Sequence, residues 1–173
     1  MKNHVRFASL LLLIATLLAF ASTAAMAGTV VYNNGAPNNE DAWTINFGFW
    51  VEDSFLLTHP TTLTQVEFAA WLFPGDALTK VQWTIFPAGA GVGMMHTGTA
   101  NVLGLGACGT NCEEESFSLP SLTLPAGTYY LRLQNAVVTN GDPAYWAESG
   151  GKSTAYQATI VGTIPSESFQ VIE

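Results

Sequence analysis

The stretch Val66-Glu67-Phe68-Ala69-Ala70-Trp71-Leu72 decides the fold class. Every second side chain in it, beginning with the first, is apolar, and in an extended strand such side chains share one face. The pattern returns in Lys80-Val81-Gln82-Trp83-Thr84-Ile85, after a Pro-Gly-Asp turn at 74–76. Two alternating segments separated by turn residues are typical of neighbouring antiparallel strands.

Similar short segments, bounded by Gly, Pro, Asn and Asp, recur along the chain, and helical periodicity is almost absent after Gly28. The further candidate strands are residues 29–32, 44–51, 54–58, 93–103, 115–119, 128–134, 156–162 and 168–172. We therefore predict an all-β fold, an antiparallel β-sandwich of the jelly-roll type with about nine strands.

The first 27 residues have the organisation of a cleavable signal peptide. Lys2 and Arg6 precede an apolar core at 10–20, and the segment ends in Ala25-Met26-Ala27. Because the core is short for a membrane span and no charged cluster follows it, we favour cleavage after Ala27 over a retained anchor. The prediction is a secreted, extracellular protein with a single mature domain, residues 28–173, and no membrane association after cleavage.

The charge balance argues against two classes of partner. The chain has 5 basic and 13 acidic residues, and removal of the signal leaves only Lys80, Arg132 and Lys152 as basic residues. The mature domain then carries a net charge of about −10, which repels phosphate backbones and anionic lipids. We therefore expect neither nucleic acid nor a membrane as a partner.

Two cysteines, Cys108 and Cys112, lie close together in the mature chain. Export to an oxidising compartment favours a disulfide between them. The alternatives are a redox-active pair, for which the sequence lacks a helical context, and a metal site, for which it lacks further ligands at suitable spacing.

The sequence offers little for catalysis. His59 and His96 stand alone, and neither a zinc-protease helix motif nor a nucleophile-elbow motif is present. Glu113, Glu114 and Glu115 form a charge run that is typical of a solvated edge. We predict that the protein is not an enzyme; the alternative is a glycan-active enzyme whose two carboxylates come from distant strands.

A Gly-rich loop predicted at 140–151 places two aromatic residues between two carboxylates. Aromatic rings stack on the C–H face of a sugar while carboxylates accept hydrogen bonds from its hydroxyls, so Asp142, Tyr145, Trp146 and Glu148 are candidate carbohydrate-binding residues. The alternative is that Trp146 plugs one end of the core.

Two further aromatic residues, Trp71 and Phe73, are out of phase with the inward set of their strand. They would extend an aromatic platform on a sheet face, or else lie beneath a covering loop.

A calcium ion is the one cofactor that we consider. Oxygen donors gather in or near predicted loops, although they lack the spacing of an EF-hand. These donors are Asn38, Asn39, Glu40, Asp41, Asp53 and Asp142. We predict no other cofactor.

Several segments together resemble a known group of proteins. They are Val-Val-Tyr-Asn-Asn-Gly at 30–35, Leu-Pro-Ala-Gly-Thr-Tyr-Tyr-Leu at 124–131, Leu-Gln-Asn-Ala at 133–136, Gly-Asp-Pro-Ala-Tyr-Trp at 141–146 and Ile-Pro-Ser-Glu-Ser-Phe at 164–169. In this combination the chain resembles secreted bacterial proteins of the PEP-CTERM exosortase-associated type. The resemblance implies export alongside exopolysaccharide. The chain lacks the C-terminal sorting tail of those proteins, so free secretion is expected rather than anchoring.

From the sequence we therefore expect a secreted, non-catalytic β-sandwich that associates with the extracellular matrix or the cell surface, with extracellular polysaccharide as its candidate partner. The alternatives are a dedicated carbohydrate-binding module and, third, the glycan-active enzyme.

Overall fold

A computed structural model describes residues 28–89, 95–158 and 161–173. The predicted signal peptide at 1–27 lies outside these ranges. The regular elements within them are thirteen β-strands, with no helix among them, so the fold is all-β as predicted. Within the same ranges, no helix is long and apolar enough to cross a membrane.

The first sheet, sheet A, is organised around the long strand β4. Its strands are β1 (Val30–Asn33), β2 (Pro37–Thr44), β4 (Thr61–Trp71), β7 (Leu103–Gly109), β8 (Cys112–Leu124), β10 (Tyr145–Ser149) and β13 (Phe169–Ile172). Strand β8 pairs along one edge of β4, while β13 and then β10 share the other edge. Strands β7, β1 and β2 extend the sheet outward from these partners.

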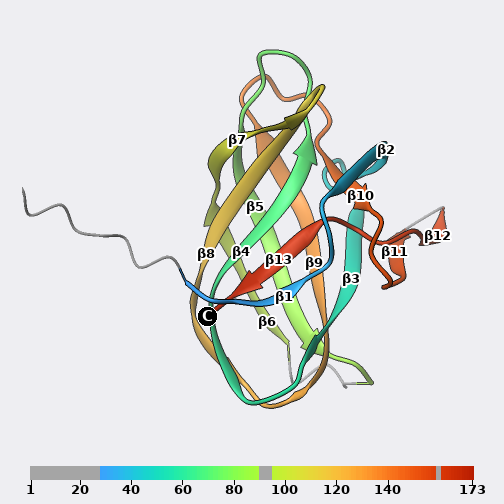
Figure 1. The fold of residues 1–173 in the computed structure, drawn as a ribbon. Coiled ribbons are helices and arrows are strands. Elements are labelled where there is room, and N and C mark those ends of the chain that lie inside the picture. Colours follow the sequence, from blue (N-terminus) through green and yellow to red (C-terminus); the bar gives the residue numbers. More distant parts are fainter. Residues whose placement is uncertain (1–27, 90–94, 159–160) are drawn as a thin grey trace, which may run out of the picture.

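The second sheet, sheet B, is antiparallel throughout, with register shifts near one end of the β5–β9 pair. Its strands, in spatial order, are β12 (Gly162–Ile164), β11 (Ala155–Ala158), β3 (Trp50–Leu57), β9 (Gly127–Val138), β5 (Leu78–Pro87) and β6 (His96–Asn101). Sheets A and B lie face to face with the apolar core between them, which is a sandwich-like arrangement (Figure 1).

The alternation predicted for the segments at 66–72 and 80–85 is confirmed. Phe68 and Ala70 of β4 and Val81, Trp83 and Ile85 of β5 are all buried in the core cluster. Their neighbours along each strand face the other side of the sheet. Period-two alternation therefore assigned the correct face to these strands.

The strands differ from the prediction in several places. Residues 45–49, expected within a strand at 44–51, lie outside the strands, and the strand expected at 156–162 gives way to β11 and β12. Residues 37–43, where no strand was predicted, belong to β2, and the loop predicted at 140–151 contains β10. The single strand expected at 93–103 gives way to two, β6 and β7. Strand β2 pairs only with β10, so one of its edges carries no partner strand among the described residues, and a polar sequence suits such a position. The jelly-roll connectivity stays a prediction.

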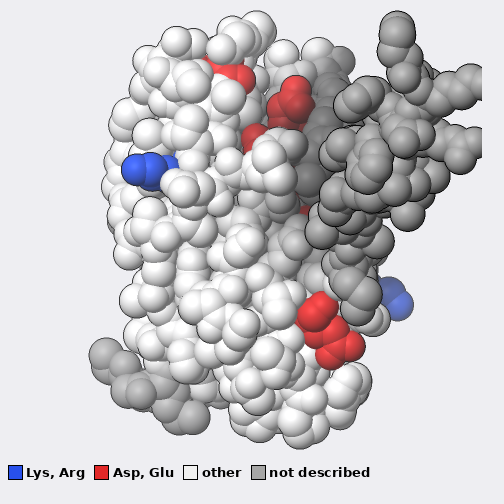
Figure 2. All heavy atoms as spheres, turned by 90° about the vertical axis from the view of Figure 1, so that its left-hand side faces the viewer, with Lys and Arg blue, Asp and Glu red and all other residues white. Residues whose placement is uncertain are grey.

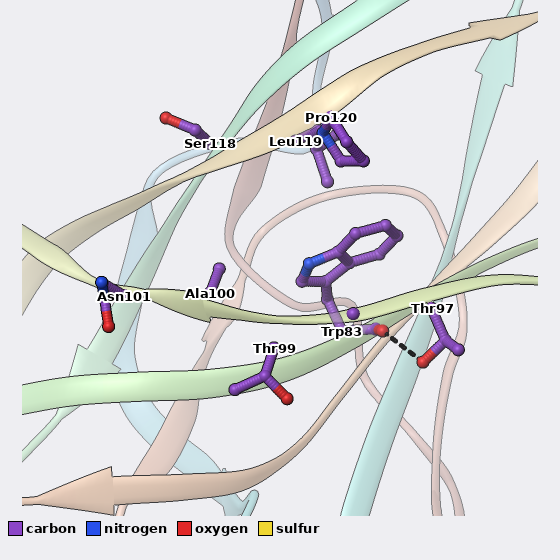
Figure 3. Close-up of a pocket in the computed structure, with 9 residues that line it drawn as sticks. Trp83, Thr97, Thr99, Ala100, Asn101, Ser118, Leu119 and Pro120 are labelled. Carbon is purple, nitrogen blue, oxygen red and sulfur yellow. Dashed lines mark hydrogen bonds between the residues drawn. The ribbon is translucent and has the colours of Figure 1, made fainter.

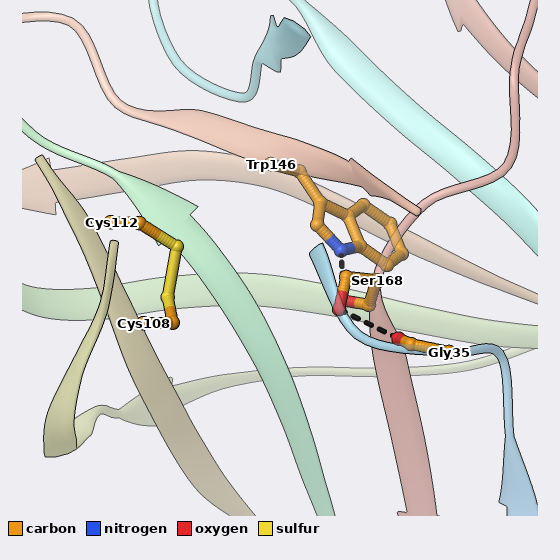
Figure 4. Close-up of a disulfide and its surroundings, with 5 residues drawn as sticks. All are labelled: Gly35, Cys108, Cys112, Trp146 and Ser168. Atoms are coloured by element: carbon orange, nitrogen blue, oxygen red, sulfur yellow. Dashed lines mark hydrogen bonds between the residues drawn. A yellow bond between two sulfur atoms is a disulfide. The ribbon is translucent and has the colours of Figure 1, made fainter. Parts of the chain in front are cut away.

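Trp146 lies at the centre of the sandwich and is 0% exposed. Its ring packs edge-on against Phe68 and Phe169, and its indole Nε1 donates a 2.8 Å hydrogen bond to the Ser168 carbonyl (Figure 4). The indole thus joins β10 to the segment that leads into β13.

Replacing Trp146 by Ala should lower the free energy of unfolding by about 3–5 kcal/mol, because the change empties a large buried volume. Chemical denaturation measures this loss. A matched control is Leu103→Ala, whose side chain is 66% exposed and whose loss should cost under about 0.5 kcal/mol. Similar losses for both variants would contradict the assignment of Trp146 to the core.

Candidate functional site

The four residues of the predicted loop site do not share one surface. Trp146 is fully buried, so it offers no ring face to a ligand, and Glu148 is also buried. Asp142 is exposed and lies beside a different hollow near residues 46–47 and 135–138. Only Tyr145 combines partial exposure with a place on a sheet face. The alternative considered from the sequence, in which Trp146 fills the core, describes its position.

Tyr145 instead joins the second predicted patch. It is the cross-strand neighbour of Trp71, and the two residues line a small hollow of about 140 Å³ together with Leu72, Phe73 and Asn111. Phe73 begins a turn in which Pro74 is followed by a glycine with φ of 87°, a geometry typical of a type II turn. We call these five lining residues, 71–73, 111 and 145, the aromatic hollow.

A larger aromatic surface covers the outer face of sheet B. Because Val51, Asp53 and Phe55 of β3 face inward, their neighbours in the strand face outward. The same alternation applies to β5, β9 and β11. The outward residues that meet across these four strands are Trp50, Glu52, Phe86, Tyr130, Arg132 and Tyr156. We call this set the aromatic ladder.

Contacts along the ladder are continuous. The rings of Tyr156 and Trp50 are 5.7 Å apart, and the guanidinium carbon of Arg132 lies 3.9 Å above the Trp50 ring. On its other side, Arg132 is 5.3 Å from the centre of the Phe86 ring, which stacks on Tyr130 at 5.4 Å. Four rings and one planar cation therefore form an unbroken row across neighbouring strands.

The ladder is held rigid and electrically balanced. Nε and Nη2 of Arg132 both donate to Oε2 of Glu52, at 2.9 and 2.7 Å. Stacking between two aromatic rings further restricts the guanidinium. The row thus carries no net charge, and Tyr156, 44% exposed, is its most accessible ring.

From the sequence, Trp71 and Phe73 were the two out-of-phase aromatic residues singled out, and the ladder was missed although its rings also lie in the outward phase of their strands. The signal was present in the outward phase, where Tyr130 and Arg132 alternate with Tyr129 and Leu131, and where Phe86 extends the polar phase of β5. Aromatic residues at positions that alternation assigns to solvent are the pattern that would have found it.

A third hollow, of about 530 Å³, lies between β6 and β8 (Figure 3). Its floor is the ring of Trp83, which is almost fully buried because Gly98 packs directly on it. Thr97, Thr99 and Ser118 also line the hollow, but their side chains belong to the outward phase of their strands, and the Thr97 hydroxyl donates to the Trp83 carbonyl. The face of the molecule seen in Figure 2 is also dominated by uncharged side chains. The hollow offers polar groups but little aromatic surface for stacking.

The disulfide between Cys108 and Cys112 is confirmed. It closes the hairpin between β7 and β8, and Cys112 packs against Ala69 and Ala147 on the outer face of sheet A. The turn residue Asn111 has a φ of 60°, and its carbonyl accepts a 2.9 Å hydrogen bond from the backbone N–H of Leu72. The cross-link therefore supports the turn whose Asn111 lines the aromatic hollow. Figure 4 shows the disulfide itself.

The acidic run at 113–115 is not simply a solvated edge. Glu115 is buried, on the same face of β8 as Phe117, and its Oε2 has no hydrogen-bond partner. Burial, together with the charge of Glu113, raises the pKa of Glu115 to about 7. Glu113 and Glu114 are only half-buried. The expectation of a solvated run therefore fails at its third residue, which follows the inward phase of its strand.

Two other acids lie directly opposite each other. Glu148 of β10 and Glu167 form an isolated antiparallel bridge, and both are buried. Neither residue lines any of the hollows described above. Within the described residues, no group of three or more His, Cys, Asp or Glu side chains is arranged to hold one metal ion.

No family model matches the chain, and no curated protein is significantly similar to it in sequence.

Replacing both cysteines by Ser should lower the free energy of unfolding by roughly 2 kcal/mol, the value expected when a very short closed loop is opened in the unfolded chain. Denaturation of the variant, and of the wild type with a reductant, measures the loss. The loss of stability in the variant should equal the loss that the reductant causes in the wild type. Unchanged stability in both experiments would contradict a stabilising role for this cross-link.

Glu115→Gln should change how stability depends on pH. Since the pKa of Glu115 in the folded chain is about 7, above its ordinary value of 4.5, the folded state binds more protons than the unfolded state between these values. The free energy of unfolding of the wild type should therefore fall as pH rises from 4.5 to about 7. In Glu115→Gln this free energy should fall less over the same range, because residue 115 no longer titrates. Unfolding midpoints measured across this window test it; parallel curves would contradict it.

Proposed function

We propose that the protein is a secreted, non-catalytic β-sandwich that associates with extracellular polysaccharide through the aromatic ladder. The observation that carries the proposal is the unbroken row of Tyr156, Trp50, Arg132, Phe86 and Tyr130 on an open sheet face. Sugar rings in a polymer present apolar C–H faces at regular intervals, and flat aromatic rings on a rigid sheet suit such faces.

Polar groups beside the ladder suit the hydroxyls of a sugar. Gln82 and Gln134 face outward on the neighbouring strands, and the amide of Asn135 donates a 2.6 Å hydrogen bond to the Gln82 side chain. Amides both donate and accept hydrogen bonds, so they can pair with hydroxyl groups of either orientation. Such groups orient a ligand whose main contact is stacking.

The charge distribution favours a neutral polysaccharide. Arg132 is neutralised by Glu52, and the mature domain as a whole is strongly acidic. A polyanion would gain little at the ladder and would be repelled at long range. The resemblance to proteins exported with exopolysaccharide agrees with this class of partner.

The aromatic hollow is the second candidate surface for the same ligand class. Phe73 is well exposed there, and Trp71 and Tyr145 flank it. The hollow is shorter than the ladder, so it would contact fewer sugar rings.

Tyr156→Ala should weaken binding to a neutral polysaccharide about tenfold, since one stacking contact of about 1.4 kcal/mol is lost. Affinity electrophoresis in gels containing a soluble glucan, a xylan or an alginate measures this. We expect retardation by a neutral polymer and little by alginate.

Two variants serve as controls. Phe47→Ala removes an aromatic ring that is 62% exposed but lies outside both surfaces, and it should leave binding unchanged. Phe73→Ala tests the aromatic hollow. If wild-type protein migrates freely in every polysaccharide, the proposed function is wrong; if only Phe73→Ala loses retardation, binding belongs to the hollow and not to the ladder.

A further inference from the structure

Two glutamates approach each other inside the sandwich at the junction of β10 with the segment before β13. Glu148 and Glu167 are directly opposite in an antiparallel bridge, and backbone hydrogen bonds of 2.7 and 2.8 Å flank the pair on either side. This is the non-hydrogen-bonded type of pair, in which the two side chains lie closest, with Cβ atoms about 4.5–5.5 Å apart.

The Glu167 carboxylate has no partner. The residue is 0% exposed, and neither Oε1 nor Oε2 has a hydrogen-bond donor. Buried polar atoms almost always have a partner, so a group with two unpaired oxygens requires an explanation. Protonation would remove the charge and give Glu167 one O–H donor, for which the Glu148 carboxylate is the nearest acceptor, but the second oxygen of Glu167 would still lack a partner.

The surroundings of Glu167 are negative. Besides Glu148, the carboxylates of Asp53 and Asp41 act on it, and burial together with these three charges raises the pKa of Glu167 well above its ordinary value. Within the described residues, the one ion pair joins Arg132 to Glu52 on the outer face of sheet B, so no Lys or Arg is paired with these four acids.

Glu148 already has a defined orientation. Its Oε1 accepts a 2.7 Å hydrogen bond from the indole of Trp43, while its Oε2 has only a long contact, 3.5 Å, to the amide of Asn38. Both donors belong to β2, the strand that carries the exposed Asp41. The site therefore has one fixed carboxylate, one unpaired carboxylate and an acidic rim at the surface.

We propose that Glu148 and Glu167 together bind a divalent cation of the calcium class. Calcium takes oxygen ligands in flexible geometry and accepts water in its remaining positions, so two protein carboxylates are a sufficient start. The cation supplies what a proton cannot, which is a partner for both oxygens of Glu167 and a positive charge among four acids. Asp41 at the rim attracts the ion.

The donors expected from the sequence contribute only in part. Asp41 and Asp53 lie near the site, but Asp53 is fully engaged with hydrogen-bond donors, and Asp142 lies elsewhere. The two ligands, Glu148 and Glu167, were not among the calcium candidates. They are 19 positions apart in a chain whose pairing the sequence does not reveal.

The test uses the purified mature protein, calcium and the luminescent substitute terbium. Calcium should bind once per chain with a dissociation constant of about 10⁻⁵–10⁻³ M and should raise the unfolding midpoint. Terbium should show emission sensitised by the nearby Trp43, and calcium should compete it away. Glu167→Gln should weaken binding of both ions at least tenfold.

Two matched variants define the site. Glu115→Gln changes a buried acid with an unpaired oxygen outside this cluster, and Glu40→Gln changes an exposed acid next to the rim. Both should bind calcium as the wild type does. Wild-type protein that shows no heat of binding and no midpoint shift at about 10 mM calcium would overturn the proposal. Equal weakening in Glu40→Gln and Glu167→Gln would also overturn it.

Discussion

One buried carboxylate, Asp53, constrains how the two sheets meet. It occupies the inward row of β3 between Val51 and Phe55, where an unpaired charge would be prohibitively costly. Its Oδ2 accepts hydrogen bonds from the amide of Asn34, the hydroxyl of Ser153 and the backbone N–H of Glu167 at 2.8–2.9 Å. These donors come from three separate segments, so satisfying one charge fixes segments near both ends of the described sandwich against sheet B.

The same constraint determines the two surfaces that carry the proposals. With Asp53 inward, Trp50 and Glu52 must face outward, where Glu52 meets Arg132 and the aromatic ladder forms. On the inner side, Asp53 takes the donors of its neighbourhood, the backbone N–H of Glu167 among them. The Glu167 side chain is left with none. The hydrogen-bond network thus gives Asp53 all the nearby donors, and for that reason the carboxylate of Glu167 has no donor.

Alternation in the sequence was sufficient for the fold class and for the faces of β4 and β5, because burial of every second side chain is a local property. It failed for β2 and β10, which are polar or short and depend on pairing with each other. The sequence also led to a wrong expectation for Trp146, because the Gly, Asn and Asp residues around it suggested an exposed loop. The disulfide was predictable because two cysteines four positions apart have few other uses in a chain that is expected to be exported. The ladder and the Glu148–Glu167 pair depend on strand register, which one sequence does not specify.

Net charge and local charge also diverge in this molecule. Some of the acidic residues counted in the sequence lie in the interior of the domain. These buried residues are Asp53, Glu115, Glu148 and Glu167. Raised pKa values at Asp53, Glu115 and Glu167, and a cation between two of the four acids, would make the effective charge less negative than the formal count. The surface that meets a partner is then more neutral than the composition implies. A neutral ladder of rings on such a surface agrees better with a neutral polysaccharide than with any charged polymer, and the buried acids serve the interior of the domain.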